Sequence, residues 1–225
     1  MMVALANSKG GVGKSTLAVH IAVWLQDHGV RVALLDADKQ QSSSLWLKDV
    51  DPGVTVRVAT TPEECLDAAV ELAESHDIVI GDGPAGLDEI SRTLLLVANL
   101  ALIPVGPSIL DVRSVQDAIQ VFRYAQRISP KHLEGALVLN KVGKRDRISR
   151  ELICSLPQLG LGAAVSTIRN LTAFRDAAQQ GTVVGRLGKT GRSAADDLDK
   201  FCVELFASIP GNPVDLQTPG GVLDE

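Results

Sequence analysis

Residues 9–16 read KGGVGKST and lie between an apolar run over residues 3–6 and a segment with apolar residues at helical spacing. That segment, residues 14–27, places Leu17 and Leu25 on one face of a helix. In a glycine-rich loop between a buried strand and a helix, backbone N–H groups turn toward phosphate oxygens near the positive end of the helix. The stretch therefore predicts a phosphate-binding loop within an α/β fold.

The residue types in this loop have separate chemical tasks. Glycines let the backbone approach phosphate closely, Lys14 places a positive charge on the β- and γ-phosphate oxygens, and Ser15 offers a hydroxyl to Mg²⁺. The loop departs from the G-x-x-x-x-G-K-[ST] pattern because Ser8 occupies the first glycine position, and it carries an additional lysine, Lys9. We expect ATP and Mg²⁺ as cofactors, with the nucleotide held by Lys9, Gly10, Gly11, Val12, Gly13, Lys14, Ser15 and Thr16.

Carboxylates follow two further apolar runs. The run over residues 30–35 ends at Asp36, with Asp38 two residues later, and the run over 78–80 leads to Asp82. Acids at the carboxyl ends of parallel strands lie at the edge where open α/β sheets bind ligands. We expect Ser15, Asp36 and Asp82 to serve Mg²⁺ and Asp38 to orient the attacking water, so that the chain hydrolyses ATP.

Apolar runs alternate with helical patterns along most of the chain. The runs are continuous rather than alternating, which indicates a doubly wound, mainly parallel sheet with helices on both faces. A capping box that begins at Thr61 opens one helix, and Gly29 ends another. A single domain is predicted over residues 1–208, followed by a flexible tail over 209–225 that is rich in Pro and Gly. Strands are expected near 3–6, 30–35, 54–58, 78–80, 100–105, 136–139 and 163–166, and helices near 14–27, 62–75, 87–98, 109–128, 146–155, 171–180 and 194–208.

The composition is that of a soluble protein from a reducing compartment. Apolar residues make up 45% of the chain and charged residues 22%, and Cys65, Cys154 and Cys202 form no CxxC pair. The chain starts with an apolar strand rather than a charged leader, and its longest apolar stretch, residues 93–110, is interrupted by Asn, Pro and Gly. We therefore expect a cytoplasmic protein without a membrane segment.

Residues 9–16 resemble the deviant Walker A motif of the ParA/MinD family of ATPases. The segments that begin at Asp36 and Asp82 resemble the family's D-x-D-P-Q and D-x-P/A motifs, with Lys39 in place of the proline, and residues 100–111 resemble its I-P-V-x-P-S-x-L-D segment. The resemblance covers about residues 1–208 and is nearest to the small, ParF-like partition ATPases. It implies a P-loop NTPase fold and an ATP-dependent homodimer in which Lys9 reaches the partner's nucleotide. The catalytic residues are then Lys9, Lys14 and Asp38.

The run over residues 136–139 leads into Asn140 and Lys141. A guanine-specific N-K-x-D motif needs an aspartate at position 143, where this chain has glycine, so adenine is expected rather than guanine. Asn140 is therefore either a contact to the adenine base or an asparagine that caps its own loop.

Positive charge is concentrated in one part of this acidic chain. The formal net charge is −5, but residues 123–192 carry 13 Lys and Arg against four acids, which leaves 9 bases and 23 acids elsewhere. Bases at such density bind DNA phosphates without reading sequence, although a charge run is often only a solvated helix face. We expect non-specific binding of double-stranded DNA through Lys144, Arg145, Arg147, Arg150, Arg169 and Arg192.

The motifs and the resemblance together favour a ParA-type ATPase. Such a protein dimerises on ATP, binds the nucleoid and positions or segregates a plasmid, a chromosome region or a protein organelle, and a ParB-like cargo adaptor stimulates its hydrolysis. The tail over 209–225 is acidic and breaks helices, which disfavours the membrane helix of MinD-type proteins. The alternative is a metabolic or maturation ATPase or kinase of the same fold that acts on a small molecule without DNA.

Overall fold

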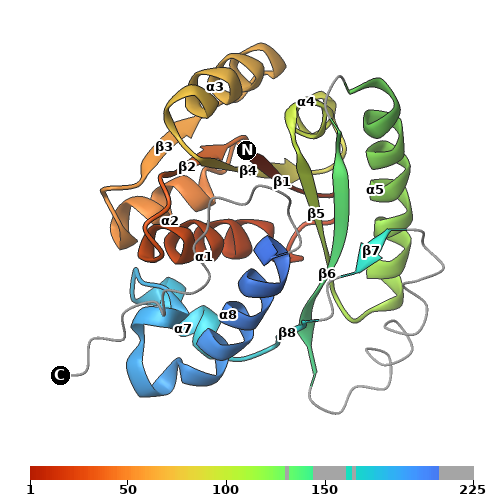
Figure 1. Ribbon diagram of the computed structural model, residues 1–225. Coiled ribbons are helices and arrows are strands. Elements are labelled where there is room, and N and C mark those ends of the chain that lie inside the picture. The colour runs from red at the N-terminus through yellow and green to blue at the C-terminus, as the bar shows by residue number, and fades with distance from the viewer. Residues whose placement is uncertain (130–131, 144–160, 164–165, 208–225) are drawn as a thin grey trace.

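The computed structural model describes residues 1–129, 132–143, 161–163 and 166–207. Within these residues seven parallel strands form one sheet in the order β3-β2-β4-β1-β5-β6-β7, and β8 pairs with the carboxyl end of β6 (Figure 1). The strands are β1 (Met2–Asn7), β2 (Val32–Asp36), β3 (Thr55–Val58), β4 (Ile78–Ala85), β5 (Leu100–Val105), β6 (Glu134–Val142), β7 (Gly162–Ala163) and β8 (Ile168–Arg169).

Helices cover both faces of this sheet. One half of the core gathers apolar side chains of α1, α2, α7 and α8, and the other half gathers those of α3, α4 and α5, as the arrangement in Figure 1 also shows. This confirms the predicted doubly wound α/β fold. The helices are α1 (Lys14–Asp27), α2 (Ser42–Val50), α3 (Pro62–Ser75), α4 (Glu89–Val97), α5 (Ile109–Ile128), α7 (Ala173–Gln179) and α8 (Arg192–Ala207), with short 3₁₀ turns η2 (Val184–Arg186) and η3 (Gly188–Thr190).

The central strands are buried along their length because both of their faces are covered. Successive side chains of β1 point to opposite halves of the core, with Val3 and Leu5 on the α1 side and Ala4 and Ala6 on the other. The apolar pattern is therefore continuous along the chain even though each face of the sheet alternates. This is the reason why the strand positions were readable from the sequence.

The strand order places the glycine-rich loop at a point where the connections diverge. From β1 the chain passes through α1 to β2 on one side of the sheet, whereas β5 lies on the other side of β1 and leads through α5 to β6. In open α/β sheets ligands bind outside the carboxyl ends of the strands at such a point. No helix in the described part of the chain is long and apolar enough to cross a membrane.

Two local predictions hold in detail. The Thr61 hydroxyl accepts a hydrogen bond from the Glu64 N–H at 3.2 Å, and the Glu64 carboxylate accepts one from the Thr61 N–H at 3.2 Å, which is the predicted capping box. Helix α1 ends at Asp27, and Gly29 follows with a φ of 74°. Both signals are local in sequence, so they could be read without knowledge of the tertiary structure.

The elements differ from the prediction in several places. Strand β8 and the turns η2 and η3 were not expected, and β6 is longer than the predicted run over 136–139 at both ends. Helix α2 was not expected, and β4 continues past Asp82 to Ala85 because β1 pairs with it over this length through an irregular register. The predicted helix over 146–155, the tail over 209–225 and part of the strand over 163–166 lie outside the described residues.

Candidate active site

The loop between β1 and α1 adopts backbone conformations that need glycine. Gly11 has a φ of 75° and Gly13, directly before α1, has a φ of 97°. A Cβ atom at Gly13 would lie 2.3 Å from the Asn140 side-chain nitrogen, a distance that no such contact tolerates. The loop is therefore shaped by its glycines and closed from the side by β6.

Three polar side chains hold this loop to the neighbouring strands. Asn7 is fully buried and donates to the Pro104 carbonyl of β5 at 2.6 Å, while its side-chain oxygen accepts from the Lys9 N–H at 3.0 Å. From β6, Asn140 donates to the Val12 carbonyl at 2.7 Å and Lys141 donates to the Gly11 carbonyl at 2.6 Å. The loop thus begins against β5 and lies against β6. Asn7 was missed, and its only signal was a polar residue at the end of an apolar run.

Asn140 was predicted as either an adenine contact or a loop cap. Its buried amide donates to Val12, and its oxygen accepts from the Lys141 N–H at 2.9 Å, so both ends of the amide are used within the chain. These contacts are those of an asparagine that supports its loop. The adenine contact stays a prediction.

Lys14 lies at the centre of the loop. Its side chain is buried, and the ammonium donates to the carbonyls of Asn7 at 3.4 Å and Lys9 at 3.3 Å. Burial lowers the pKa of Lys14, and the negative charges of Asp82 and Asp38 oppose this shift. The predicted lysine and two of the predicted carboxylates are therefore close together.

The parallel register between β2 and β4 brings two of the predicted acids together. Asp36 and Asp82 are directly paired across these strands, and both side chains are fully buried. The Asp36 carboxylate accepts hydrogen bonds from the Asp38 N–H at 3.0 Å and from the Ser44 N–H at 2.9 Å. Asp36 therefore closes the turn after β2 and caps the amino end of α2.

The turn from Asp38 to Gln41 forms with a lysine at the position of the family's proline. The Asp38 carbonyl accepts from the Gln41 N–H at 2.9 Å, and the Asp38 carboxylate accepts from the Gln40 N–H at 2.9 Å. Lys39 is exposed, and its φ is not positive, so a residue other than proline fits this position without an unusual backbone conformation. Gln41 has a positive φ of 52°, an uncommon conformation for a residue other than glycine.

Asp82 has the least satisfied carboxylate among these acids. Both of its oxygens are buried and have no hydrogen-bond partner within the described residues, and the same is true of the Ser43 hydroxyl. Burial, with a contribution from the charge of Asp36, raises the pKa of Asp82 to about 6. The Ser15 and Ser43 hydroxyls and Lys14 lower this pKa, although neither hydroxyl forms a hydrogen bond of good geometry with the carboxylate.

This group of side chains fits a small hard cation. An unsatisfied buried carboxylate beside a second carboxylate and two hydroxyls is unfavourable without a positive charge. Mg²⁺ typically takes one or two protein carboxylates and fills its other positions with water and phosphate oxygens. No group of three or more His, Cys, Asp or Glu side chains in the described residues could hold a metal by itself. The residues therefore suit Mg²⁺ bound together with a phosphate ligand.

The remaining loop residues lie between β1 and the first turn of α1. Gly10 and Gly11 are exposed, Val12 is buried, and Lys9 is partly buried at the rim of the site. The Thr16 carbonyl accepts from Nδ1 of His20 at 2.7 Å. The predicted contact of Lys9 with the nucleotide of a second protein chain stays a prediction.

His20 was not predicted as part of this region. It is buried in α1, and its Nε2 accepts from the Val184 N–H at 3.2 Å while Nδ1 donates to Thr16, which fixes one neutral tautomer. Burial lowers the pKa of His20 to about 4. His20 thereby connects the first turn of α1 to η2, 164 residues later.

The residues predicted to bind DNA are only partly described. Lys144, Arg145, Arg147 and Arg150 lie outside the described residues. Arg169 is held by Asp197, with the shortest guanidinium–carboxylate distances at 2.8 Å, and it also donates to the Ser193 carbonyl, whereas Arg192 is exposed at the start of α8. Arg186, another base of the same region, pairs with Asp27 and Asp51 at 2.7 and 2.9 Å. Part of the positive charge is thus neutralised by internal ion pairs.

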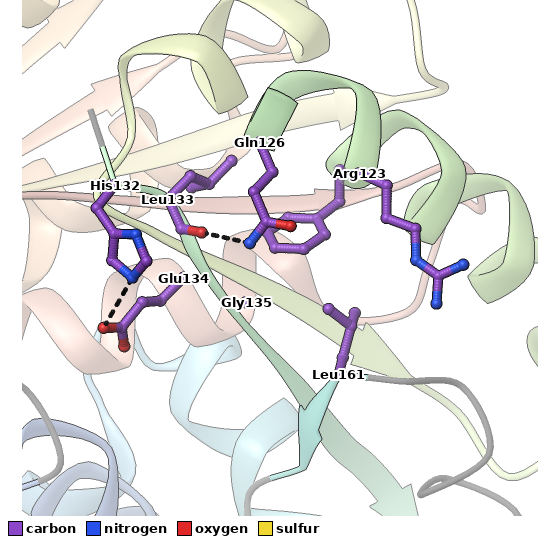
Figure 2. A pocket seen from close by; sticks show the side chains of 8 residues that line it. Arg123, Gln126, His132, Leu133, Glu134, Gly135 and Leu161 are labelled. Carbon is purple, nitrogen blue, oxygen red and sulfur yellow. Dashed lines mark hydrogen bonds and ion pairs between the residues drawn. The ribbon is translucent and has the colours of Figure 1, made fainter. Parts of the chain in front are cut away.

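A separate cavity of about 370 Å³ lies at the opposite end of β6. Figure 2 shows it between α5 and the first residues of β6, with an ion pair of 3.7 Å between His132 and Glu134 at its rim. None of the predicted nucleotide, metal or DNA residues lines it. The candidate active site is therefore at the carboxyl end of the sheet and does not include this cavity.

Comparisons with known proteins agree with this geometry. The family model described as the CobQ/CobB/MinD/ParA nucleotide binding domain matches residues 3–197. A protein of Halothiobacillus neapolitanus named maintenance of carboxysome distribution protein A is 35% identical over 212 residues, which is 91% of this chain and 96% of that protein.

Solved structures show the same fold. A Cyanothece McdA in complex with ATP has a TM-score of 0.66 at 18% identity and covers 88% of this chain and 95% of its own. A cobyrinic acid a,c-diamide synthase of Mycobacterium smegmatis, bound to an ATP analogue and magnesium, has a TM-score of 0.66 at 23% identity, with 79% of this chain and 92% of its own covered.

Proposed function

The chain belongs to the CobQ/CobB/MinD/ParA nucleotide-binding domain family, and from this premise we propose that it is a ParA-type ATPase that positions an intracellular cargo. The observation that carries the proposal is the set of residues at the site. A second lysine, Lys9, adjoins the phosphate loop, and the buried carboxylate of Asp82 has no hydrogen-bond partner among the described residues. Asp82 also lies close enough to Lys14 to affect the pKa of its ammonium. The name of the Halothiobacillus relative, similar over nearly its whole length, supports a protein organelle such as a carboxysome as the cargo.

ATP is bound by residues 9–16. Backbone N–H groups of the loop hold phosphate oxygens, and the Lys14 ammonium exchanges its contacts with the Asn7 and Lys9 carbonyls for the β- and γ-phosphates. Mg²⁺, held by Ser15, Asp82 and Asp36, neutralises charge on the phosphates. Asn140 supports the loop from the side through its hydrogen bond to the Val12 carbonyl. Its contact to adenine stays a proposal, made because the chain lacks the aspartate of a guanine-specific motif.

Hydrolysis requires a positioned water and compensation of the charge that builds up on the phosphates. We assign the orientation of this water to Asp38, which follows β2 at the carboxyl end of the sheet. The assignment is supported by its proximity to Lys14, since the charge of Asp38 opposes the lowering of the pKa of that ammonium. Lys9 completes the site of a second copy of the chain, so that ATP drives dimerisation before it is hydrolysed.

The ATP-bound dimer binds DNA without reading sequence, in the cytoplasm and on the nucleoid. The support is the excess of bases over residues 123–192, of which Arg175, Lys189 and Arg192 are exposed. Arg169 and Arg186 contribute less, because each is paired with a carboxylate. A ParB-like adaptor on the cargo stimulates hydrolysis and releases the dimer from DNA.

The test is DNA binding in different nucleotide states. Fluorescence anisotropy of a duplex of random sequence is measured with ATP, with ADP and without nucleotide, each at two salt concentrations. Binding is expected only with ATP and is expected to weaken as salt rises, because bound phosphates release counterions. Lys14→Ala should abolish it, and Arg192→Ala should reduce it while leaving ATP binding intact.

Absence of DNA binding in every state would refute this proposal. ATP turnover that responds to a small molecule and not to DNA would favour the alternative, a metabolic or maturation enzyme of the same fold. The cobyrinic acid a,c-diamide synthase shows that an enzyme with a small-molecule name can have this fold. At 23% identity, the similarity to it concerns the fold alone.

A further inference from the structure

We propose that Ser43 is an additional positioning residue of the metal site, whose hydroxyl binds a water molecule of the Mg²⁺ held by Asp82. The inference rests on the proposed ATPase function. Ser43 lies in the first turn of α2. None of the motifs and none of the predicted metal residues lies in this helix. The effect of Ser43 is therefore separable from the roles assigned to Ser15, Asp36 and Asp82.

The hydroxyl of Ser43 makes no hydrogen bond to any described residue of the ligand-free protein. The residue is fully buried, and its oxygen has no hydrogen-bond partner within the described part of the chain. A buried hydroxyl without a partner destabilises the fold relative to alanine, because its hydration is lost and nothing replaces it. A serine here is explained if a partner arrives with the ligand.

The neighbouring serines show that this situation is specific to one position. Ser42 is exposed to solvent, and Ser44 is buried but donates from its hydroxyl to the Gln41 carbonyl at 3.0 Å. Of three consecutive serines, only Ser43 is both buried and unsatisfied.

The other unsatisfied atoms nearby belong to Asp82. Its two carboxylate oxygens are buried without partners, and Ser43 is close enough to influence their pKa without forming a hydrogen bond to them. Two neighbouring polar groups that both lack a partner can be satisfied by one shared third group. A metal-bound water suits this role because it donates to oxygen atoms and belongs to the cation that the carboxylate attracts.

The position of Ser43 is fixed by the same acids that form the site. Asp36 accepts from the Ser44 N–H at 2.9 Å and so holds the first turn of α2 against the carboxyl end of β2. Because Asp36 and Asp82 are paired across the sheet, this contact also sets where Ser43 lies relative to Asp82. The hydroxyl is thus placed by the backbone and needs no rearrangement of the helix.

The experiment compares Ser43→Ala with Ser44→Ala as a matched control. Melting temperature is measured for the full chain without ligand, with ADP and EDTA, and with ADP and Mg²⁺, and calorimetry gives ADP affinity as a function of Mg²⁺ concentration. For Ser43→Ala we expect a melting temperature equal to or above that of the wild type without ligand. Its Mg²⁺-dependent gain in ADP affinity should fall about tenfold, as for other residues that orient metal ligands. Ser44→Ala should melt lower without ligand and keep the full Mg²⁺ response.

Two results would overturn the inference. If Ser43→Ala lowers the ligand-free melting temperature as Ser44→Ala does, the hydroxyl has a partner in the ligand-free protein and the premise of the inference is wrong. If Ser43→Ala and wild type respond equally to Mg²⁺, the hydroxyl does not contact the metal's water. A wild-type protein that does not respond to ADP at all would instead refute the proposed function.

Discussion

Asp82→Asn is expected to stabilise the ligand-free protein while removing its response to Mg²⁺. The wild-type carboxylate is buried without a hydrogen-bond partner among the described residues, and its pKa is raised from 3.8 to about 6. Above pH 6 the folded protein must therefore hold an ionised group that its surroundings disfavour. Asparagine has the same shape and no charge, so the substitution removes this cost.

The magnitude follows from the pKa. A rise from 3.8 to about 6 corresponds to a free-energy cost of about 3 kcal/mol at pH 7.5, at 1.36 kcal/mol per pKa unit. This is an upper bound, because the new amide is itself a buried polar group. We expect a gain of about 1–3 kcal/mol, or roughly 3–10 °C in melting temperature for a chain of this size.

The stabilisation by Asp82→Asn depends on pH. A carboxyl whose folded pKa is raised is most favourable below its unfolded pKa, and its contribution is lost as pH rises from about 4 to about 6. The difference in unfolding free energy between Asp82→Asn and wild type should therefore be largest at pH 7.5 and vanish near pH 4. Taking this difference cancels the titration of all other groups.

The assay is urea unfolding at both pH values, repeated with ADP and Mg²⁺. Asp77→Asn is the control, because Asp77 pairs with Arg31 at 2.6 Å and its pKa is lowered, so this substitution should not stabilise the protein. The reasoning is refuted if Asp82→Asn is less stable than wild type at pH 7.5, or if the gain is the same at pH 4.

Three further predictions concern the surroundings of the loop. Because the pKa of His20 is lowered from 6.5 to about 4, the wild type should lose about 3 kcal/mol of unfolding free energy as pH falls through this range, and His20→Gln should lack that part of the slope in urea unfolding. An equal slope in both proteins would contradict it. Gly13→Ala should abolish binding of a fluorescent ATP analogue, because Gly13 has a positive φ and an added Cβ would lie 2.3 Å from the Asn140 side chain. Gly29 also has a positive φ but open space around it, so Gly29→Ala should lower the unfolding free energy by about 1 kcal/mol and leave binding of the analogue intact. Asn140→Ala should weaken ATP and GTP binding equally if Asn140 only supports the loop through Val12, and a selective loss for ATP would instead indicate a contact to adenine.

The phosphate loop and its acids were predictable because their signals are local. Residues 9–16 carry the loop in consecutive positions, and Asp36 and Asp82 each end a recognisable apolar run. A parallel sheet brings the ends of such runs to one edge, so the fold class placed Asp36 and Asp82 at the same edge. Their direct pairing depends on the strand order, which only the structure shows.

Helix α2 was missed because its stabilising contact is not local. Its Ser-Ser-Ser start has no capping residue of the usual kind, since Gln41 makes no side-chain cap, and the cap comes instead from Asp36 in the preceding strand. Ser43 could not be singled out for the same reason. Only the structure shows which of the three serines faces Asp82.

The contacts that hold the loop were also beyond the sequence pattern. Asn140 and Lys141 contact the loop from β6, and they are separated from their partners in the loop by 128 and 130 residues, respectively. Lys141 was counted among the bases of the charged region, and Arg169 was predicted to bind DNA, but both donate to groups within the chain. Charge along a sequence does not distinguish a free cation from one that an acid of another element neutralises.

The most direct test of the proposed function is the mass of the protein in solution with saturating ATP and Mg²⁺. It is measured by light scattering on the variant Asp38→Ala, which the proposed role of Asp38 predicts to be deficient in hydrolysis. The account predicts a change from the monomer mass of 23.8 kDa to twice that value, no change with ADP, and a monomer in every state when Lys9→Ala is added. A variant that binds ATP and stays at 23.8 kDa, or a Lys9→Ala protein that dimerises as readily, would contradict the proposal that the chain works as an ATP-dependent homodimer.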